Sequence, residues 1–208
     1  NHGKKSWEIR VHRALAGQSK FLFKVEDAFG GIIYDEDEIP VMMNLSGDEL
    51  RVNSRSKTLI VEGNVQATLI KKESDPSIKR EPIFIKADTL RYFDSTKKGY
   101  MGGHAQFKRE NTTVFPRGDI ELDVQNNIVS LPSGFRAISQ DFEVSANKLV
   151  IELDRNYAEL YGRVLITKFA QKLPSAQIDS RESELRSKPT FLSCDSFNLS
   201  FIYVSKCH

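Results

Sequence analysis

The residues of this chain that could bind a metal ion or take part in catalysis are few and far apart. Its four histidines form no HExxH motif and no set with cysteine at zinc-binding spacing: His2, His12, His104 and His208. Cys194 and Cys207 are thirteen residues apart, which is not the spacing of a CxxC redox pair. The sequence also has no GxSxG motif and no Walker loop. We therefore expect a protein that is not an enzyme and that uses neither a metal nor a cofactor.

An acidic segment and two glycine pairs are the remaining candidates for ion binding. Residues 35–38 lack the glycine and the alternating oxygen ligands of a calcium loop, so we interpret them as a solvated turn. The isolated glycine pairs at 30–31 and 102–103 are more typical of backbone bends than of phosphate cradles. His104 follows the second pair and is expected on the outer surface. We therefore expect these residues to form turns and bends of the backbone, not an ion-binding site.

The composition favours one domain without a nucleic-acid partner. The 208 residues are 39% hydrophobic, which is enough to bury a core in a single domain. Thirty basic residues against 28 acidic ones give a net charge of +2, which indicates no nucleic-acid partner. No apolar run approaches the roughly 18 residues that a membrane-spanning helix requires.

A repeat in the sequence indicates which secondary-structure elements the chain forms. The same pattern occurs four times: a small residue is followed by Asp or Asn, and a glycine lies sixteen residues after the small residue. The four units are 47–63, 87–103, 118–134 and 146–162, and each has the pattern of a strand, a polar turn and a second strand. The pattern predicts a β-repeat protein in which each glycine bends or interrupts a strand.

The third unit differs from the other three. Leu50, Leu90 and Leu149 occupy the fourth position in the other units, whereas the third has Glu121 there, flanked by two apolar residues. A shift of one residue moves every side chain of a strand to the opposite face. We therefore expect either a bulge or a different pairing register in this unit.

Alternation of apolar and polar residues indicates the fold class. The period is two within each unit, as in antiparallel sheets with one buried face, and the turns are clusters of Asn, Asp, Ser and Lys. No segment of comparable length has the 3.6-residue period of a helix. The sequence predicts an all-β fold of repeated antiparallel strands.

The chain divides into three predicted regions. Residues 1–26 have a local excess of five positive charges and read as edge strands protected by charge, with contact to anionic lipid as the weaker alternative. Residues 27–169 hold the repeats, including a charged insertion at 71–82. Residues 170–208 read as a linker or a disordered tail, although 197–208 have strand propensity.

The repeats resemble a known family. The segments 87–129 and 146–168 are similar to the OstA-like repeats of the lipopolysaccharide-export periplasmic proteins, the LptA and LptC family. Gly63-Asn64-Val65 matches the end of those repeats fully, whereas 103–105 and 162–164 match it in part. YDEDE at 34–38 is similar to a turn in LptC-like domains. The resemblance covers about residues 30–168.

The resemblance implies a slightly open, twisted β-jelly roll, or β-taco, whose apolar trough holds acyl chains. The residues that would contact the lipid are Leu50, Val52, Leu59, Val61, Val65, Leu69, Leu90, Tyr92, Phe107, Phe142, Val144, Leu149, Ile151, Leu153, Leu160, Val164 and Ile166. The residues that would meet headgroup phosphates are Arg91, Lys97, Lys98, Lys108 and Arg109. A filled core is the alternative interpretation, because the alternation of residues alone does not distinguish it from a trough.

The resemblance also implies partners and a compartment. Lipopolysaccharide or a related glycolipid would be the ligand, and other jelly-roll components of an export bridge would join through edge strands. We expect the last strand near 146–168 to be offered to such a partner, unless the tail covers it. The implied location is the periplasm, with a possible inner-membrane anchor outside this sequence. Two alternatives stay open: a structural β-solenoid without a lipid, and a plastid or other eukaryotic lipid-transfer protein.

Overall fold

The chain folds entirely as β-strands and turns over the residues that its structure describes. This computed structural model describes residues 4–16, 21–70, 82–155, 157–169, 190–200 and 203–207. Its strands are β1 Trp7–Ala16, β2 Leu22–Tyr34, β3 Pro40–Asn53, β4 Thr58–Leu69, β5 Ile83–Phe93, β6 Lys98–Gly102, β7 Gln106–Arg109, β8 Thr112–Pro116, β9 Ile120–Asp123, β10 Ile128–Leu131, β11 Phe135–Ile138, β12 Phe142–Ala146, β13 Lys148–Glu152, β14 Tyr157–Lys168, β15 Thr190–Ser200 and β16 Tyr203–Cys207. The predicted all-β class is confirmed.

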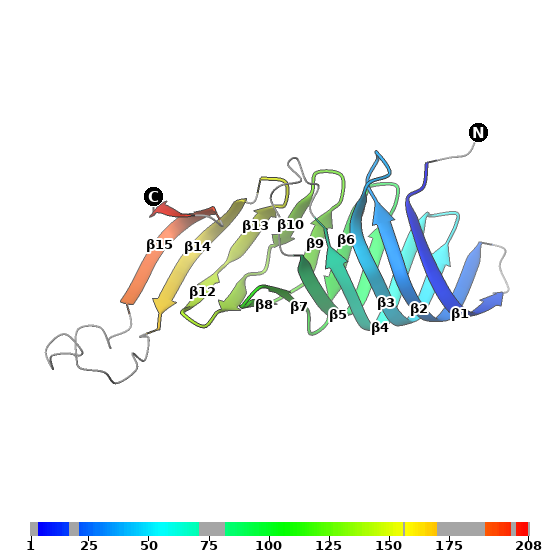
Figure 1. Cartoon of the computed structure of the whole chain (residues 1–208), viewed down its shortest axis with the longest axis horizontal. Helices are drawn as coiled ribbons and strands as arrows, with labels where there is room; N and C mark the ends of the chain where they lie inside the picture. The colour runs from blue at the N-terminus through cyan, green and yellow to red at the C-terminus, as the bar shows by residue number, and fades with distance from the viewer. Residues whose placement is uncertain are drawn as a thin grey trace, which may run out of the picture.

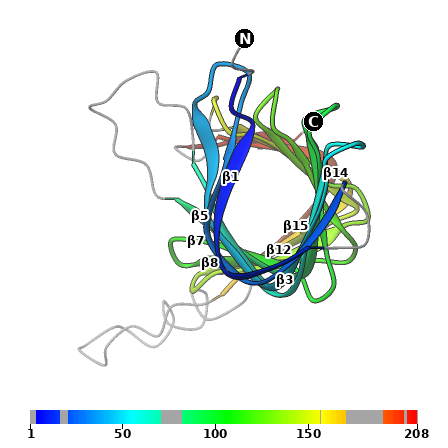
Figure 2. The same ribbon diagram turned by 90° about the vertical axis from the view of Figure 1, so that its right-hand side faces the viewer.

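The strands form one antiparallel sheet that is rolled into two facing halves. Long strands β2 to β5 and β14 each cross both halves, whereas β6, β9, β10 and β13 lie in one half and β7, β8, β11 and β12 lie in the other. The strands lie side by side along the long axis of the molecule (Figure 1). Viewed along that axis, the ribbons outline a twisted jelly roll (Figure 2).

The repeat glycines form the corner at which the chain passes from one half to the other. Asp48 lies opposite the end of its unit: its Oδ2 accepts a hydrogen bond of 2.8 Å from Asn64 Nδ2. A Cβ atom on Gly63 would lie 2.4 Å from that same Oδ2, so a side chain cannot fit there. Gly63 also has a φ of 75°, a left-handed value that glycine adopts without steric penalty. The repeat spacing therefore reflects a contact between an acidic residue and a glycine fifteen residues later on the neighbouring strand.

The second and fourth units build the corner in a related way. His104 Nδ1 lies 2.8 Å from Asp88 Oδ2, and the His104 side chain is 93% exposed, as expected from the sequence. In the fourth unit, the backbone N–H of Asn147 donates to the Gly162 carbonyl at 2.9 Å, and the register of β14 shifts between Tyr161 and Val164. The prediction that glycines interrupt the ladder is confirmed at these positions.

The third unit has a different register, which was one of its two predicted alternatives. Ile120 and Leu122 are 0% and 4% exposed, whereas Glu121 between them faces solvent. The pairing of β9 with β6 and β10 runs without a shift. Asp119 lies against Gly102, since a Cβ there would be 2.3 Å from Asp119 Oδ1. Inward residues therefore begin one position after Asp119, instead of two positions after the acidic residue as in the first unit.

Two rows of turns form the free margins of the two halves. Turn row A consists of the turns at 54–57, 94–97, 124–127 and 153–155, and turn row B consists of those at 35–39, 110–111 and 139–141. Neighbouring turns of row A are joined by backbone hydrogen bonds, such as Asp94 N to Lys57 O at 3.0 Å and Val124 N to Lys97 O at 2.9 Å. The margin at row A is thus continuous along the roll.

Local side chains explain why the chain reverses at row A. Asn53 Oδ1 accepts hydrogen bonds of 3.0 Å from the backbone N–H groups of Arg55 and Ser56. Lys57 then has a φ of 52°, which returns the chain to the sheet. A short polar side chain that bonds to the backbone just after it is the usual reason for Asn in turns.

Both ends of the chain differ from the predicted regions. Residue 26 lies within β2, which pairs with β1 on one side and β3 on the other, so the sheet is continuous across that boundary. The prediction of a linker or disorder is wrong for 190–200 and 203–207, because these segments form β15 and β16. Residues 71–81 of the charged insertion and 170–189 of the tail lie outside the described residues.

The predicted free edge at residues 146–168 is also wrong. β14 pairs with β12 and β13 along one side and with β15 along the other. The alternative, in which the tail covers this strand, is therefore the arrangement observed. The described ranges contain no helix that is long and apolar enough to cross a membrane.

Candidate functional site

The predicted lipid-contact residues lie mostly in the interior between the two halves of the roll. Thirteen of them are at most 6% exposed: Leu50, Leu59, Val61, Val65, Leu69, Leu90, Tyr92, Phe107, Val144, Leu149, Ile151, Leu160 and Val164. Val52, Leu153 and Ile166 are partly buried against this cluster, and Phe142 is 37% exposed. In this state the interior side chains pack against one another and are nearly free of water contact.

Both halves contribute to this interior. Leu90 and Ile151 lie on strands of the half that ends at turn row A, whereas Phe107 and Val144 lie on strands of the half that ends at row B. The corner joins the halves through backbone, whereas the two turn rows are margins that the sheet ladder does not join. Access for a bulky apolar ligand from the side would therefore lie between the rows.

The five predicted headgroup residues do not form one cluster. Lys97 and Lys98 lie in or beside turn row A, and Arg91 lies exposed on the outer face of the same half. Lys108 and Arg109 lie at the end of β7, beside turn row B. The sequence alone does not indicate which margin each of these residues reaches.

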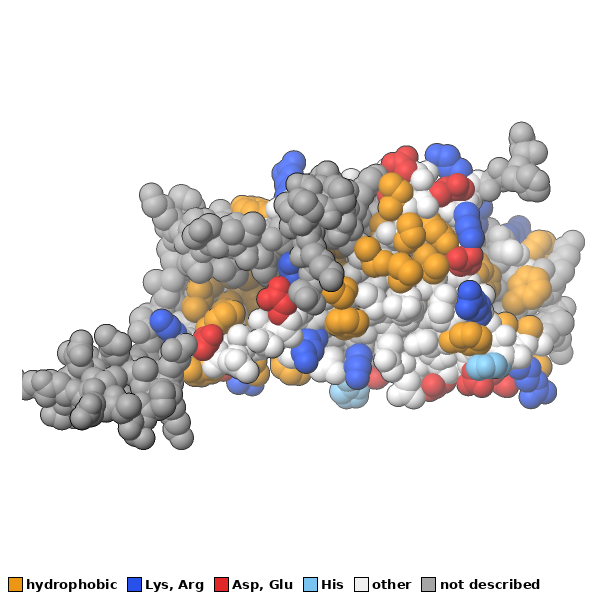
Figure 3. Space-filling model, viewed as in Figure 1, with side chains coloured by type: hydrophobic (Ala, Val, Ile, Leu, Met, Phe, Trp, Pro, Cys, Tyr) orange, Lys and Arg blue, Asp and Glu red, His pale blue; other side chains and the backbone are white. Residues whose placement is uncertain are grey.

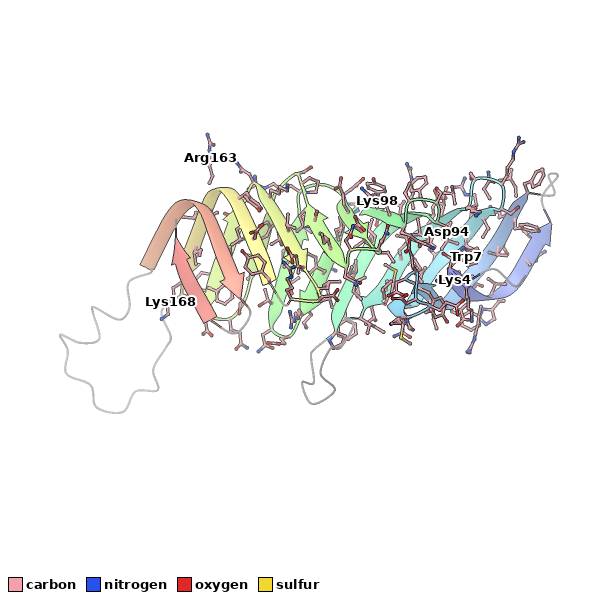
Figure 4. All side chains as sticks on the ribbon, turned by 90° about the horizontal axis from the view of Figure 1, so that it is seen from above. Lys4, Trp7, Asp94, Lys98, Arg163 and Lys168 are labelled. Carbon is pink, nitrogen blue, oxygen red and sulfur yellow. The ribbon has the colours of Figure 1, made fainter. Side chains whose placement is uncertain are left out.

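A short segment before β1 bridges the two turn rows, and sequence analysis did not identify it. On the row B side, the Ser6 carbonyl accepts a hydrogen bond of 2.9 Å from the backbone N–H of Tyr34. On the row A side, Ser6 Oγ donates to Asp94 Oδ1 and accepts a 2.7 Å hydrogen bond from Lys97 Nζ. Figure 4 shows Trp7 and Lys4 beside Asp94, although the chain between Ser6 and Asp94 spans 88 residues. We call residues 4–6 the latch.

Further contacts hold the latch on the row B side. Lys4 Nζ donates to the Glu36 carbonyl at 2.8 Å, and the backbone N–H of Lys5 donates to Glu38 Oε1 at 2.7 Å. Both acceptors belong to the acidic turn at 35–39. The prediction that residues 35–38 are solvated is right for 36–38, which are exposed, and wrong for Asp35, which is 7% exposed. The turn is ordered by Asp35, whose Oδ1 accepts backbone hydrogen bonds of 2.9 Å at residues 37 and 39. The acidic turn is thus a docking point for basic N-terminal residues.

Electrostatics favour the closed latch. Burial raises the pKa of the Asp94 carboxyl, but hydrogen bonds from Lys97 and Ser6 and the attraction of Lys97 and Lys57 outweigh it, so its pKa lies below the ordinary value. The side chains of Asp94 and Lys97 are each 18% exposed. A Ser–Lys pair can act as a nucleophile only with a neutral amine as base. Here a carboxylate pairs with the ammonium, so the three groups form a clasp rather than an activated serine.

A buried hydroxyl lies close to the clasp. Tyr92 is 1% exposed, faces the interior, and its hydroxyl has no hydrogen-bond partner of normal geometry among the described residues. Burial raises the pKa of this phenol to about 12, with Ser6 acting in the opposite direction. A buried hydroxyl without a partner is unfavourable by about 1–3 kcal/mol, so it is an exception that invites a functional explanation.

Replacing Tyr92 with phenylalanine is expected to raise the free energy of unfolding by about 1 kcal/mol, because it removes an unpaired hydroxyl and little volume. In the wild type, burial disfavours the ionised phenol, so this group leaves stability unchanged below its ordinary pKa of 10.0 and lowers it as pH rises to about 12. Urea unfolding at neutral and alkaline pH tests both effects. A variant that is less stable than wild type at neutral pH would show that the hydroxyl has a partner.

The described residues hold no group of three or more His, Cys, Asp or Glu side chains that could bind a metal ion. Their outer surface carries exposed hydrophobic side chains on several strands, including Phe29, Phe84, Phe115 and Leu165. Figure 3 shows hydrophobic groups among charged ones on one face of the molecule. The latch is a set of polar contacts that lies next to the apolar interior, so we treat the two together as the candidate site.

Comparisons with known proteins find similar solved structures, with nine matching chains. No family model and no curated protein matches the chain. The chain is similar to a crystal structure of LptH, described as the LptA-homologous periplasmic component of the lipopolysaccharide transport device from Pseudomonas aeruginosa. The TM-score is 0.43 and the sequence identity is 12%, and the alignment covers 59% of this chain and 79% of that chain. At this level of similarity, a function for the chain depends on its own repeats and geometry.

Proposed function

We propose that this protein is a lipid-binding component of a bridge that carries lipopolysaccharide to the outer membrane. The single observation that supports this role is the apolar interior, which both halves line along the strand order from β2 to β14. Acyl chains entering between the halves would replace contacts that the side chains now make with one another. Each buried methylene contributes about 0.8 kcal/mol, so affinity needs no catalytic group.

The interior must open for this function. In the closed state Leu90 and Val61 are both 0% exposed, so neighbouring side chains cover their surfaces completely. Parting turn rows A and B would expose the inner faces while the corner contacts and the strand ladder persist. Basic residues at the margins, among them Lys97, Lys98 and Lys108, would then flank the phosphates of a headgroup outside the apolar interior.

End-to-end assembly is the second element of the proposal. Among the described strands, β1 pairs with β2 alone and β16 with β15 alone, so each has a backbone edge available for another strand. These edges lie at opposite ends of the strand order, in contrast to β14, whose two sides are both occupied. Other jelly-roll components would add strands there, and the proposed location is the periplasm.

Photocrosslinking tests the lipid contact. Benzoylphenylalanine at Leu90, Phe107 or Ile151 is expected to crosslink to lipopolysaccharide, because all three side chains point into the interior from different strands. The same group at Arg91 or Glu152, the next residue along two of these strands, is expected to give no crosslink. Crosslinked lipid is measured by immunoblot after denaturing electrophoresis.

The alternative candidate is a structural β-roll without a lipid, and the tightly packed interior favours it. That role predicts no crosslink from any interior position in protein whose cooperative unfolding is intact. Crosslinks from Arg91 and Glu152 at the same yield as from the interior would likewise contradict the proposal, since they would indicate lipid adsorbed on the outer surface.

A further inference from the structure

We propose that the latch closes a side entrance to the interior, and that Tyr92 and the lysines of turn row A receive the polar part of an anionic amphiphile there. This inference rests on the proposed lipid-binding function and adds to it the place and order of entry. The acyl chains would pass between the two turn rows when residues 4–6 withdraw. The headgroup would remain at the margin.

The position of the latch is the first argument. Ser6 is bonded to Tyr34 at the end of β2 and to Asp94 in the β5–β6 turn, so it spans from one margin of the roll to the other. The bridge lies directly before β1, where the chain has not yet entered the sheet ladder. Withdrawal of residues 4–6 would therefore leave the pairing of β1 with β2 intact.

The chemistry of the latch makes it releasable. Its contacts are hydrogen bonds made by lysine, serine, carboxylate and backbone groups that are partly exposed, and water can replace each of them. Asp94 and Lys97 remain paired when Ser6 leaves, because their own contact does not involve it. Opening of the latch would thus leave no unpaired charge in the interior.

The Tyr92 hydroxyl is the second argument, because Ser6 of the latch acts on it without a hydrogen bond of normal geometry. The side chain is 1% exposed and lies on the inner face, beside the clasp. In the closed state its hydroxyl lacks a partner of normal geometry among the described residues. An ester, amide or hydroxyl oxygen at the junction between a polar head and an acyl chain would supply that partner while the chain itself occupies the apolar interior.

The lysines of turn row A favour an anionic ligand on that side of the latch, whereas the turn at 35–39 on the row B side is acidic. Lys97 contacts the clasp, Lys98 follows it, and Lys57 is near enough to attract the Asp94 carboxylate. Three ammonium groups against one carboxylate leave a local excess of positive charge on turn row A. A phosphate or carboxylate headgroup could pair with these lysines, whereas a neutral headgroup could not.

A disulfide across the latch tests the entrance. In a background with Cys194→Ser and Cys207→Ser, the pair Ser6→Cys and Asp94→Cys would lock the two margins together when oxidised. We expect the oxidised protein to load fluorescent lipopolysaccharide about tenfold more slowly or worse than the reduced protein, because a locked gate limits entry. Stopped-flow fluorescence measures loading before and after reduction.

A matched control separates gating from the presence of a disulfide. Ser130→Cys and Val150→Cys join register partners on β10 and β13 within one half of the roll, where a crosslink spans no margin. This pair is expected to load at the same rate in both redox states. Equal rates for oxidised and reduced latch variants would overturn the entrance while leaving the lipid-binding proposal standing. Failure of the parent protein to bind lipopolysaccharide at all would overturn both.

The polar contacts are tested separately. Tyr92→Phe is expected to weaken lipopolysaccharide binding by about tenfold while its unfolding stays cooperative, since one hydrogen bond is lost. Enzymatic removal of the lipid phosphates is expected to weaken binding to the wild type and to reduce its salt dependence. Unchanged affinity in the first case would remove Tyr92 from the site, and unchanged affinity in the second would remove the lysines.

Discussion

Replacement of Leu90 by aspartate is expected to abolish the cooperative fold. Leu90 is 0% exposed on β5, where it lies opposite Val61 of β4 and Met101 of β6. Truncating such a side chain to alanine costs about 2–5 kcal/mol, and a buried unpaired charge costs several kcal/mol more. Together these approach the whole stability of a typical domain, which is about 5–15 kcal/mol.

The sole tryptophan reports on this change. Trp7 packs partly buried against the core, so its fluorescence should respond to unfolding in urea. Leu90→Ala provides an intermediate step of about 2–5 kcal/mol. Arg91→Glu, at the exposed neighbouring position, is expected to change the free energy of unfolding by no more than about 0.5 kcal/mol. A folded Leu90→Asp protein with wild-type stability would show that water already reaches this part of the interior.

Gly63→Ala is expected to be the second most damaging of the changes considered, with a cost of about 2–4 kcal/mol. The left-handed φ of 75° alone disfavours alanine by about 1–2 kcal/mol. In addition, the new Cβ would lie 2.4 Å from Asp48 Oδ2 and 3.0 Å from Asp48 Cβ, so the corner contact would have to move. Loss of the Asp48–Asn64 hydrogen bond would follow.

Gly99 offers the matched control for this substitution. It is buried on β6, but its φ lies outside the left-handed range and an added Cβ would meet Leu122 Cδ1 at an ordinary 3.4 Å. Gly99→Ala should therefore be neutral within about 1 kcal/mol, since reduced freedom of the unfolded chain offsets minor repacking. Chemical denaturation of both variants checks the difference. Equal costs at the two positions would contradict the role assigned to the corner.

The repeats made the central strands and corners predictable because their information is local. Each predicted unit of strand, turn and strand spans 17 residues, and the residues that form it appear in sequence order. The repeat spacing predicted where each glycine interrupts a strand, and the structure adds the reason, because Asp48 and Gly63, fifteen residues apart, meet at the corner. Glu121 indicated that the third unit differs from the others. Its altered register agrees with the one-residue shift of the inward-facing apolar positions.

Features that depend on distant partners could not be predicted in this way. β15 follows a polar stretch, and its pairing with β14 joins residues such as Lys168 and Thr190 across a long connection. The latch joins Ser6 to Asp94, two residues whose types are common in any surface turn. Nothing in either local sequence indicates the other, because strand tilt and the roll of the sheet bring them together. The interior residues were predictable from alternation, but their closed packing was not.

The strand order has a consequence for how the molecule would respond to mechanical load. The N-terminal strand lies at one end of the long axis and the C-terminal strands at the other, and the strands run across that axis (Figure 1). Backbone hydrogen bonds of antiparallel strands point perpendicular to the strands, and so here along the axis. Tension between the two termini would therefore peel strands away one at a time from each end, instead of shearing many hydrogen bonds at once. A chain of such rolls would extend by stepwise unzipping under low force.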